Sequence, residues 1–189
     1  MTALVDLTVG SPQFRIKESS SEKAALYKVY SQIDLSDDLT GVESEFQENR
    51  TIRTMDAVTT LNEKDIIFSL VSGKASLVQK NHEGYLYTQN YVVIKNEAKI
   101  DAGFLVYLLN EDKSIAHRFR MGLQGSMVLK YTVKQLRELT LPKLPAIARQ
   151  KTIGKTYLKQ LHLQALRERV AKNETIMRLA QLEGDHIHE

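Results

Sequence analysis

Residues 141–182 read LPKLPAIARQKTIGKTYLKQLHLQALRERVAKNETIMRLAQL, and this stretch decides the fold of the chain. Two prolines stand near its start, at Pro142 and Pro145, and no proline follows them within the stretch. Proline ends helices because it lacks a backbone N–H and clashes with the preceding turn. The pair therefore predicts a boundary between a globular domain, residues 1–145, and a helical region, residues 146–189.

The helical region carries an apolar seam whose residues recur at alternating steps of three and four, as in a coiled coil. The seam consists of Leu163, Leu166, Val170, Asn173, Met177 and Ala180. A continuous helix here would be roughly 50 Å long, which is longer than a small core requires. We therefore expect the seam to pack against a partner helix, most simply that of a second copy. Asn173 either fixes the register of that pairing or marks where the helix turns and Ile176 and Leu179 take over.

Ahead of the prolines, the middle of the chain is rich in predicted strands. Residues 61–73 form a polar turn cluster followed by a short apolar run that ends at a glycine, which indicates a buried strand. Two further strands are predicted at 75–79 and 85–95, and Asp101 is placed to cap a helix with apolar residues over 104–109. The expected fold class is α/β in content (α+β): one mixed, strand-rich domain followed by a long coiled-coil-type helix.

The composition is that of a globular protein, with 42% hydrophobic and 26% charged residues. The chain has no cysteine, which excludes disulfides, thiolate nucleophiles and thiolate metal sites and fits a reducing compartment. No window approaches the roughly 18 consecutive apolar residues of a membrane span, and the N-terminus lacks a basic leader. We therefore expect a cytoplasmic protein without a membrane segment.

Positive charge is concentrated in the second half of the chain. Residues 1–110 contain 11 Lys and Arg against 15 Asp and Glu, whereas residues 111–189 contain 15 against 8. Residues 113–172 hold 14 basic residues and only two acidic ones. Such a segment is able to neutralise several phosphates of a nucleic acid, although a solvated basic face has the same composition.

Residue patterns for catalysis are sparse. No Gly-x-Ser-x-Gly elbow occurs, and His82, His117 and His162 stand in unrelated contexts, which favours lone surface histidines. Residues 72–76, SGKAS, lack the first glycine of a phosphate loop and the Ser or Thr after its lysine. The C-terminal His-x-His pair lacks a third metal ligand nearby. We therefore expect no catalytic residue, no bound cofactor and no metal site in this chain.

One enzymatic alternative stays open, a magnesium-dependent nuclease. Such enzymes pair an Asp with a later Glu-x-Lys, so that two carboxylates hold the cation and the lysine polarises the attacking water. Asp65 with Glu97 and Lys99 has this pattern. However, Glu-x-Lys is frequent in so charged a chain, and residues 96–99 read as a polar turn after a strand.

Six segments carry a resemblance to a known family. They are Leu61–Ser69 with Gly73, Tyr87–Ile94, Ile100–Leu109, Gly122–Ser126, Leu136–Pro145 and Gln150–Ile153. In this order they resemble the specificity (S) subunits of type I restriction-modification enzymes. Lys64 stands where the family has a glycine, and Ala148-Arg149 stands where it has an acidic residue before Gln150. Family members usually have two recognition domains and two long helices, so the resemblance is to a half-length form.

The resemblance implies a non-catalytic, DNA-recognising subunit whose domain inserts loops and strands into the major groove. The side chains then expected to read base edges are Arg118, Arg120, Gln124, Ser126 and Lys130, with Ser72, Lys74, Gln89 and Asn90 from the neighbouring hairpin. Those expected to contact phosphates are Lys113, Lys134, Arg149, Lys151, Lys155 and Lys159.

The resemblance also implies partners. A methyltransferase subunit carrying S-adenosylmethionine would modify double-stranded DNA at a bipartite target, and a translocating nuclease subunit is a further candidate. Two copies joined through their helices would each read one half of a symmetric target. The third function class left open is a scaffold or inhibitor that occupies the S-subunit position without reading DNA.

Overall fold

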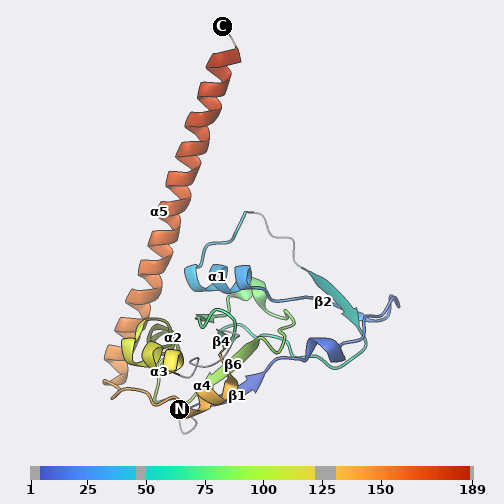
Figure 1. Ribbon diagram of the computed structural model, residues 1–189, viewed down its shortest axis with the longest axis vertical. Helices are drawn as coiled ribbons and strands as arrows, with labels where there is room; N and C mark the ends of the chain where they lie inside the picture. Colours follow the sequence, from blue (N-terminus) through green and yellow to red (C-terminus); the bar gives the residue numbers. More distant parts are fainter. Residues whose placement is uncertain (1–4, 46–49, 122–130, 188–189) are drawn as a thin grey trace.

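A four-stranded antiparallel sheet in the order β1-β6-β4-β5 forms the centre of the domain. The computed structural model describes residues 5–45, 50–121 and 131–187. Its elements are β1 (Val5–Val9), η1 (Gln13–Arg15), β2 (Ala25–Lys28), α1 (Gln32–Thr40), β3 (Thr51–Thr54), β4 (Ile66–Ser69), β5 (Ala75–Leu77), η2 (Lys80–His82), β6 (Tyr91–Asn96), α2 (Ala102–Glu111), α3 (Lys113–Met121), α4 (Val133–Glu138) and α5 (Ile147–Ile187). The α+β class with a long C-terminal helix is thereby confirmed (Figure 1).

Strands β4 and β6 are buried on both faces because alternate side chains of each strand supply two different cores. Ile66 and Phe68 pack with Leu105 of α2 in the larger core. Ile67, between them in sequence, packs in the second core with Tyr30 and with Leu35 of α1. The central sheet is therefore the middle layer of the domain, with α2 and α1 on opposite sides (Figure 1).

The predicted hairpin is present, since β4 and β5 pair antiparallel with Phe68 opposite Ala75. The strand predicted at 85–95 was only partly right, because its ladder begins at Tyr91. Residues 85–90 instead make isolated bridges, including those of Leu86 to Val29 and Thr60. Residues 85–90 thus leave the central ladder and join the central sheet to the segments that contain Ser11, Val29 and Thr60.

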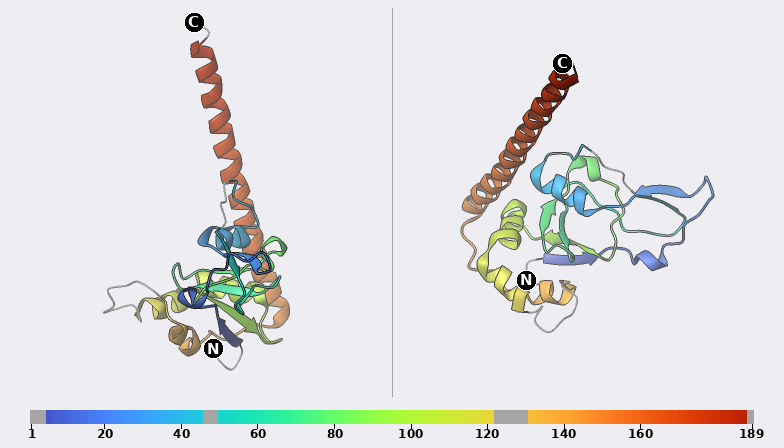
Figure 2. Two further views of the ribbon diagram at one scale, coloured as in Figure 1. Left: turned by 90° about the vertical axis from the view of Figure 1, so that its right-hand side faces the viewer. Right: turned by 45° about the horizontal axis from the view of Figure 1, so that its top comes forward.

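Strands β2 and β3 form a separate two-stranded ribbon with Tyr27 opposite Ile52. Ile52 is buried with Leu86 at the root of the ribbon. Leu26 and Lys28, on the other face, are exposed. The ribbon therefore extends from the layered part of the domain while remaining anchored to it (Figure 2).

Helix α2 begins as predicted, because the Asp101 carboxylate accepts a hydrogen bond from Phe104 N at 3.0 Å. Helix α5 crosses α2 where Gly154 lies against the backbone of Gly103 and Phe104. The first turns of α5 thus pack on the domain, and the rest of the helix projects from it (Figure 1). The division of the chain at Pro145 stays a prediction.

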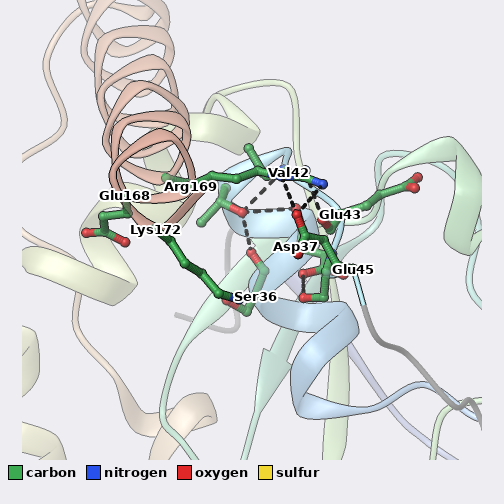
Figure 3. A pocket seen from close by; sticks show the side chains of 11 residues that line it. Ser36, Asp37, Val42, Glu43, Glu45, Glu168, Arg169 and Lys172 are labelled. Carbon is green, nitrogen blue, oxygen red and sulfur yellow. Dashed lines mark hydrogen bonds and ion pairs between the residues drawn. The ribbon is translucent and has the colours of Figure 1, made fainter. Parts of the chain in front are cut away.

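The loop that follows α1 is tied to α5 further along the helix (Figure 3). Arg169 Nη2 and Nε each lie 3.1 Å from Glu45 Oε1, and Arg169 Nη1 donates to the carbonyl of Glu43 at 3.4 Å. His162 Nδ1 lies 2.8 Å from the carbonyl oxygen of Thr40. A groove of about 450 Å³ remains between this loop and the helix. These contacts hold the direction in which α5 leaves the domain.

The predicted seam lies along α5 with its apolar side chains open to solvent. Leu163, Leu166, Val170 and Met177 are between 40% and 63% exposed, and Asn173 is exposed among them. Within residues 5–45, 50–121 and 131–187, no helix is both long and apolar enough to span a membrane.

Candidate nucleic-acid interface

The turn between β4 and β5 and the loop before β6 lie together at one end of the central sheet. The backbone N–H of Leu70 donates to the carbonyl of Asn90 at 2.8 Å, which joins the two segments. Three predicted reading residues, Ser72, Gln89 and Asn90, are thereby brought together, and the side chains of Ser72 and Gln89 are exposed. We call this end of the sheet, residues 70–74 and 88–90, the hairpin tip.

A buried hydroxyl fixes the shape of the hairpin tip. Ser69 Oγ accepts hydrogen bonds from the backbone N–H groups of Val71 and Ser72, each at 3.1 Å. Gln32 Nε2, from the start of α1, donates to Ser69 Oγ at 2.9 Å and to the Tyr91 hydroxyl at 2.7 Å. Burial raises the pKa of Tyr91 to about 12, so this hydroxyl stays protonated. The hydrogen bonds among Ser69, Gln32 and Tyr91 therefore hold the backbone of the hairpin tip in place.

A recess of about 300 Å³ opens beside the hairpin tip, between it and the β2–β3 ribbon. Its buried floor is formed by Val29, Tyr30 and Tyr91. Polar side chains surround that floor, namely those of Gln13, Ser31, Arg50, Thr88 and Asn90. We call this hollow the polar recess. Of these residues, Asn90 was predicted from the sequence to read bases, and Gln13 and Arg50 were not.

Beneath the recess lies a buried charged cluster, and here the prediction of a lone surface histidine was wrong for His82. His82 is 2% exposed. Its Nδ1 lies 2.7 Å from Asp38 Oδ1 and its Nε2 lies 3.2 Å from Asp34 Oδ1. Burial alone would lower the pKa of His82, but hydrogen bonds to the two carboxylates and their charges raise it to about 9. The hydroxyl of Tyr30, in the recess floor, donates to Asp38 Oδ2 at 2.6 Å.

The two predicted arginines of α3 are exposed, while Ile115 and Phe119 anchor that helix in the core. Phe119 stacks on Phe68 with ring centroids 5.6 Å apart. Arg118 borders a hollow of about 260 Å³ between α3 and α4, and Arg120 Nε donates to the carbonyl of Ala116 at 3.3 Å. The remaining predicted readers, Gln124, Ser126 and Lys130, lie outside the described residues.

Two further lysines were predicted to contact DNA. Lys74 belongs to the hairpin tip but is partly neutralised, and Lys155 lies away from the tip. Lys74 Nζ is 3.9 Å from a carboxylate oxygen of Glu111, which also accepts a hydrogen bond from Tyr157. Lys155 lines a groove of about 520 Å³ together with Lys64, Lys151 and Lys159. The turn containing Lys64 precedes β4 whereas Ser72 follows it, so this lysine groove lies at the opposite end of the strand from the tip.

The other predicted phosphate contacts are surface residues. Lys113, Lys134 and Arg149 are all exposed. Lys134 Nζ lies 3.8 Å from Glu138 Oε1, one turn along α4. The structure therefore leaves these side chains accessible without gathering them into one site.

No family model matches the chain, and no curated protein sequence is significantly similar to it. Solved structures are similar. The HsdS subunit from Thermoanaerobacter tengcongensis superposes with a TM-score of 0.56 and 18% identity, covering 96% of this chain and 41% of that one. A chain from a structural study of the assembly and conformational transition of a type I restriction-modification system gives a TM-score of 0.60 at 18% identity, covering 96% and 42%.

The chain has the fold of a type I specificity subunit. It spans about two fifths of the length of those solved chains. At this level of identity the similarity concerns the fold.

Gln150, which carries part of the sequence resemblance, and Lys64, which departs from the family pattern, both have defined structural settings. Gln150 is 2% exposed, and its Oε1 accepts from Asp101 N at 3.0 Å while its Nε2 donates to the carbonyls of Pro145 and Lys99. It thus joins the start of α5 to the start of α2. Lys64, in the family's glycine position, has φ +68°, a left-handed conformation that favours glycine.

The residues of the nuclease hypothesis, Asp65, Glu97 and Lys99, lie in turns next to strands β4 and β6. The Asp65 carboxylate accepts hydrogen bonds from N and Nδ2 of Asn62 and so closes the turn before β4. Glu97 and Lys99 are exposed in the turn after β6. Over the described ranges, no group of three His, Asp or Glu side chains is arranged to hold a metal ion.

Proposed function

We propose that the chain is the DNA-recognition subunit of a type I restriction-modification system. The observation that carries this proposal is the specificity-subunit fold over 96% of the chain. In this role the chain performs no catalysis. It binds double-stranded DNA and directs a methyltransferase subunit, which carries S-adenosylmethionine, to a bipartite target; a nuclease subunit is a further partner.

The hairpin tip is the part of the described domain that we assign to base reading. Ser72, Gln89 and Asn90 present hydroxyl and amide groups, which match the donor and acceptor patterns of base edges in the major groove. Their support by Ser69, Gln32 and the central sheet restricts their movement. Arg118 and Arg120 are assigned to the same task from α3. Phosphate contacts from exposed lysines would position the domain without reading sequence.

Pairing through α5 would give the bipartite target. The apolar seam from Leu163 to Met177 is exposed over a helix that projects from the domain. A second copy is the simplest partner for this seam, and a symmetric pair of domains would read two half-sites at a spacing that α5 sets.

The test is selection from a library of randomised DNA duplexes by the purified chain together with its methyltransferase subunit. We expect enrichment of one motif with two specific parts and an unspecific spacer. Enrichment of no motif, with the complex assembled, would contradict the proposal and favour a scaffold that does not read DNA. DNA cleavage by the chain alone with Mg²⁺, abolished by Glu97→Ala, would favour the nuclease instead.

The lysine groove gives a separate prediction about phosphate contacts. Lys155→Ala should reduce the slope of log Kd against log salt concentration by about one and weaken all sequences alike. The matched control is Arg178→Ala, which removes a charge from the projecting part of α5 and should leave the slope unchanged. Titrations at several salt concentrations measure both, and an unchanged slope for Lys155→Ala would remove the groove from the DNA interface.

A further inference from the structure

The polar recess combines a fixed floor with side chains that are available to a ligand. The floor residue Tyr30 is held by its hydrogen bond to Asp38, and Tyr91 by its hydrogen bond from Gln32. Both rings are less than 5% exposed, and they pack edge to face with centroids 5.4 Å apart. A rigid apolar floor restricts water and so strengthens hydrogen bonds made above it.

Two of the surrounding side chains are only loosely engaged. Arg50 Nη2 lies 3.1 Å from Glu18 Oε1, but the two side chains are 56% and 65% exposed, so this ion pair is weak and readily exchanged. Gln13 is exposed, and its amide makes no hydrogen bond to the part of the chain that the structure describes. Both side chains are therefore able to hydrogen-bond a ligand in the recess at little cost.

The position of the recess suits double-stranded DNA. It lies between the hairpin tip and the β2–β3 ribbon, and Asn90 belongs to both the tip and the recess. A two-stranded ribbon has the width that the major groove admits. The ribbon projects from the layered part of the domain (Figure 2), so a groove that received it would bring base edges over the recess.

The chemistry of the two side chains then assigns their bases. The planar fork of an arginine matches the O6 and N7 acceptors of guanine, and the amide of a glutamine matches N6 and N7 of adenine. We propose that the polar recess is a base-reading subsite in which Arg50 reads a guanine and Gln13 reads an adenine of the target. This inference rests on the proposed function, since it requires sequence-specific DNA binding.

The experiment repeats the duplex selection, in complex with the methyltransferase subunit, for wild type, Arg50→Ala, Arg50→Lys and Gln13→Ala. Both Arg50 variants should lose the preference for guanine at one position, with discrimination falling at least about fivefold. Arg50→Lys should do so while keeping general affinity, because it retains the charge without the fork. Gln13→Ala should relax one adenine position by a similar factor.

The control is Lys23→Ala, which removes a charge from another exposed residue near the ribbon and should leave the motif unchanged. All variants are exposed on the surface, and thermal unfolding checks that they fold. If the Arg50 variants select the full wild-type motif, whether or not they bind more weakly, Arg50 contacts phosphate or nothing and the subsite is overturned. If wild type itself selects no motif, the proposed function fails, and the two failures are thereby distinguished.

Discussion

Lys64 shows how one residue can oppose its local geometry. The turn Asn62–Asp65 is closed by a hydrogen bond from Asp65 N to the Asn62 carbonyl, and its third residue, Lys64, has φ +68°. A positive φ at that position is typical of a type II turn, where glycine is preferred. The side chain of Lys64 is 81% exposed and contributes little packing that would offset the strain.

Replacing Lys64 with glycine should therefore stabilise the domain. We expect Lys64→Gly to raise the free energy of unfolding by about 0.5–1 kcal/mol, since relief of the left-handed strain exceeds the added flexibility of the unfolded chain. Chemical denaturation measures the change. Glu63→Gly, one residue earlier and without positive φ, should lower stability instead; stabilisation by both variants would show that the strain at Lys64 is not the cause.

The buried charges of His82 and Asp34 should make stability depend on pH. The pKa of His82 is raised to about 9 by its two carboxylate partners, so its stabilising effect is complete below its ordinary value of 6.5 and is lost as pH rises through 9. Burial alone would raise the pKa of Asp34, but hydrogen bonds from His82 and Ser31 outweigh burial and lower it. The contribution of Asp34 to the free energy of unfolding is therefore lost as pH falls below 3.8, the ordinary pKa of Asp. Stability should thus be greatest between pH 3.8 and pH 6.5, the ordinary pKa values of Asp and His.

Between pH 6.5 and 9 we expect the free energy of unfolding to fall by on the order of 3 kcal/mol. Urea denaturation across this range measures the decrease. His82→Gln should be less stable at pH 6 but nearly independent of pH over the same interval. A wild type whose stability stays flat up to pH 9 would show that His82 is not protonated in the folded state.

At this scale the sequence could predict Asp101, whose cap is local, but not His82 or Arg50. The partners of His82 lie 44 and 48 positions away, both on α1, and no local pattern connects them to His82. Arg50 reaches the recess only because β3 pairs with β2. Contacts between distant segments set the surroundings of both residues. The charge or periodicity of a single segment does not predict such contacts.

Among the elements, the crossing of α2 and α5 depends on a glycine within a helix. A Cβ added at Gly154 would lie 2.4 Å from Phe104 N and 2.5 Å from the carbonyl carbon of Gly103, both backbone atoms that cannot move aside. A helix-interior glycine usually costs about 1 kcal/mol relative to alanine. Here the close approach of the two helices makes it necessary.

We therefore expect Gly154→Ala to lower the free energy of unfolding by about 1–3 kcal/mol, opposite to its effect in an isolated helix. Gly103→Ala on the facing helix is the matched control, because its Cβ would meet neighbours only at ordinary distances of 3.4 Å and more. That control should change stability by less than about 1 kcal/mol. Thermal unfolding of both variants decides, and a stabilised Gly154→Ala would contradict the close crossing.

The elements that were predicted have a strong local pattern, whereas β1 and the β2–β3 ribbon lack one and were missed. Helix α5 and the β4–β5 hairpin have apolar periods and turn residues that identify them. Strand β1 was missed because its five residues gain their partner only from β6, with Val9 opposite Val92. The β2–β3 ribbon was missed for the same reason, since three of its four β2 residues are exposed and carry no buried pattern.

At the scale of the whole molecule, the projecting part of α5 is the feature that indicates a partner. Its direction is held by Arg169 and the loop after α1 (Figure 3), yet its seam residues are exposed. The first 14 residues of α5 carry four basic and no acidic residues, whereas residues 180–189 carry three acidic and no basic ones. Charge thus favours antiparallel pairing of two copies.

A charge placed in the seam should prevent that pairing. We expect Leu166→Asp to weaken self-association of the chain at least about tenfold, because it would bury an unpaired carboxylate between two helices. Thr175→Asp introduces the same charge on the opposite, exposed face of α5 and should associate like wild type. Sedimentation velocity over a concentration series measures both; a wild type that stays monomeric at tens of micromolar, alone and with the methyltransferase subunit, would contradict pairing.

The function of the assembled molecule is tested most directly by mapping methylated bases in the DNA of cells that express the chain with its methyltransferase subunit. We expect methylation at one bipartite motif that is absent when the chain is omitted. Methylation that is absent, or whose motif does not depend on the chain, would contradict its role as the subunit that chooses the target sequence.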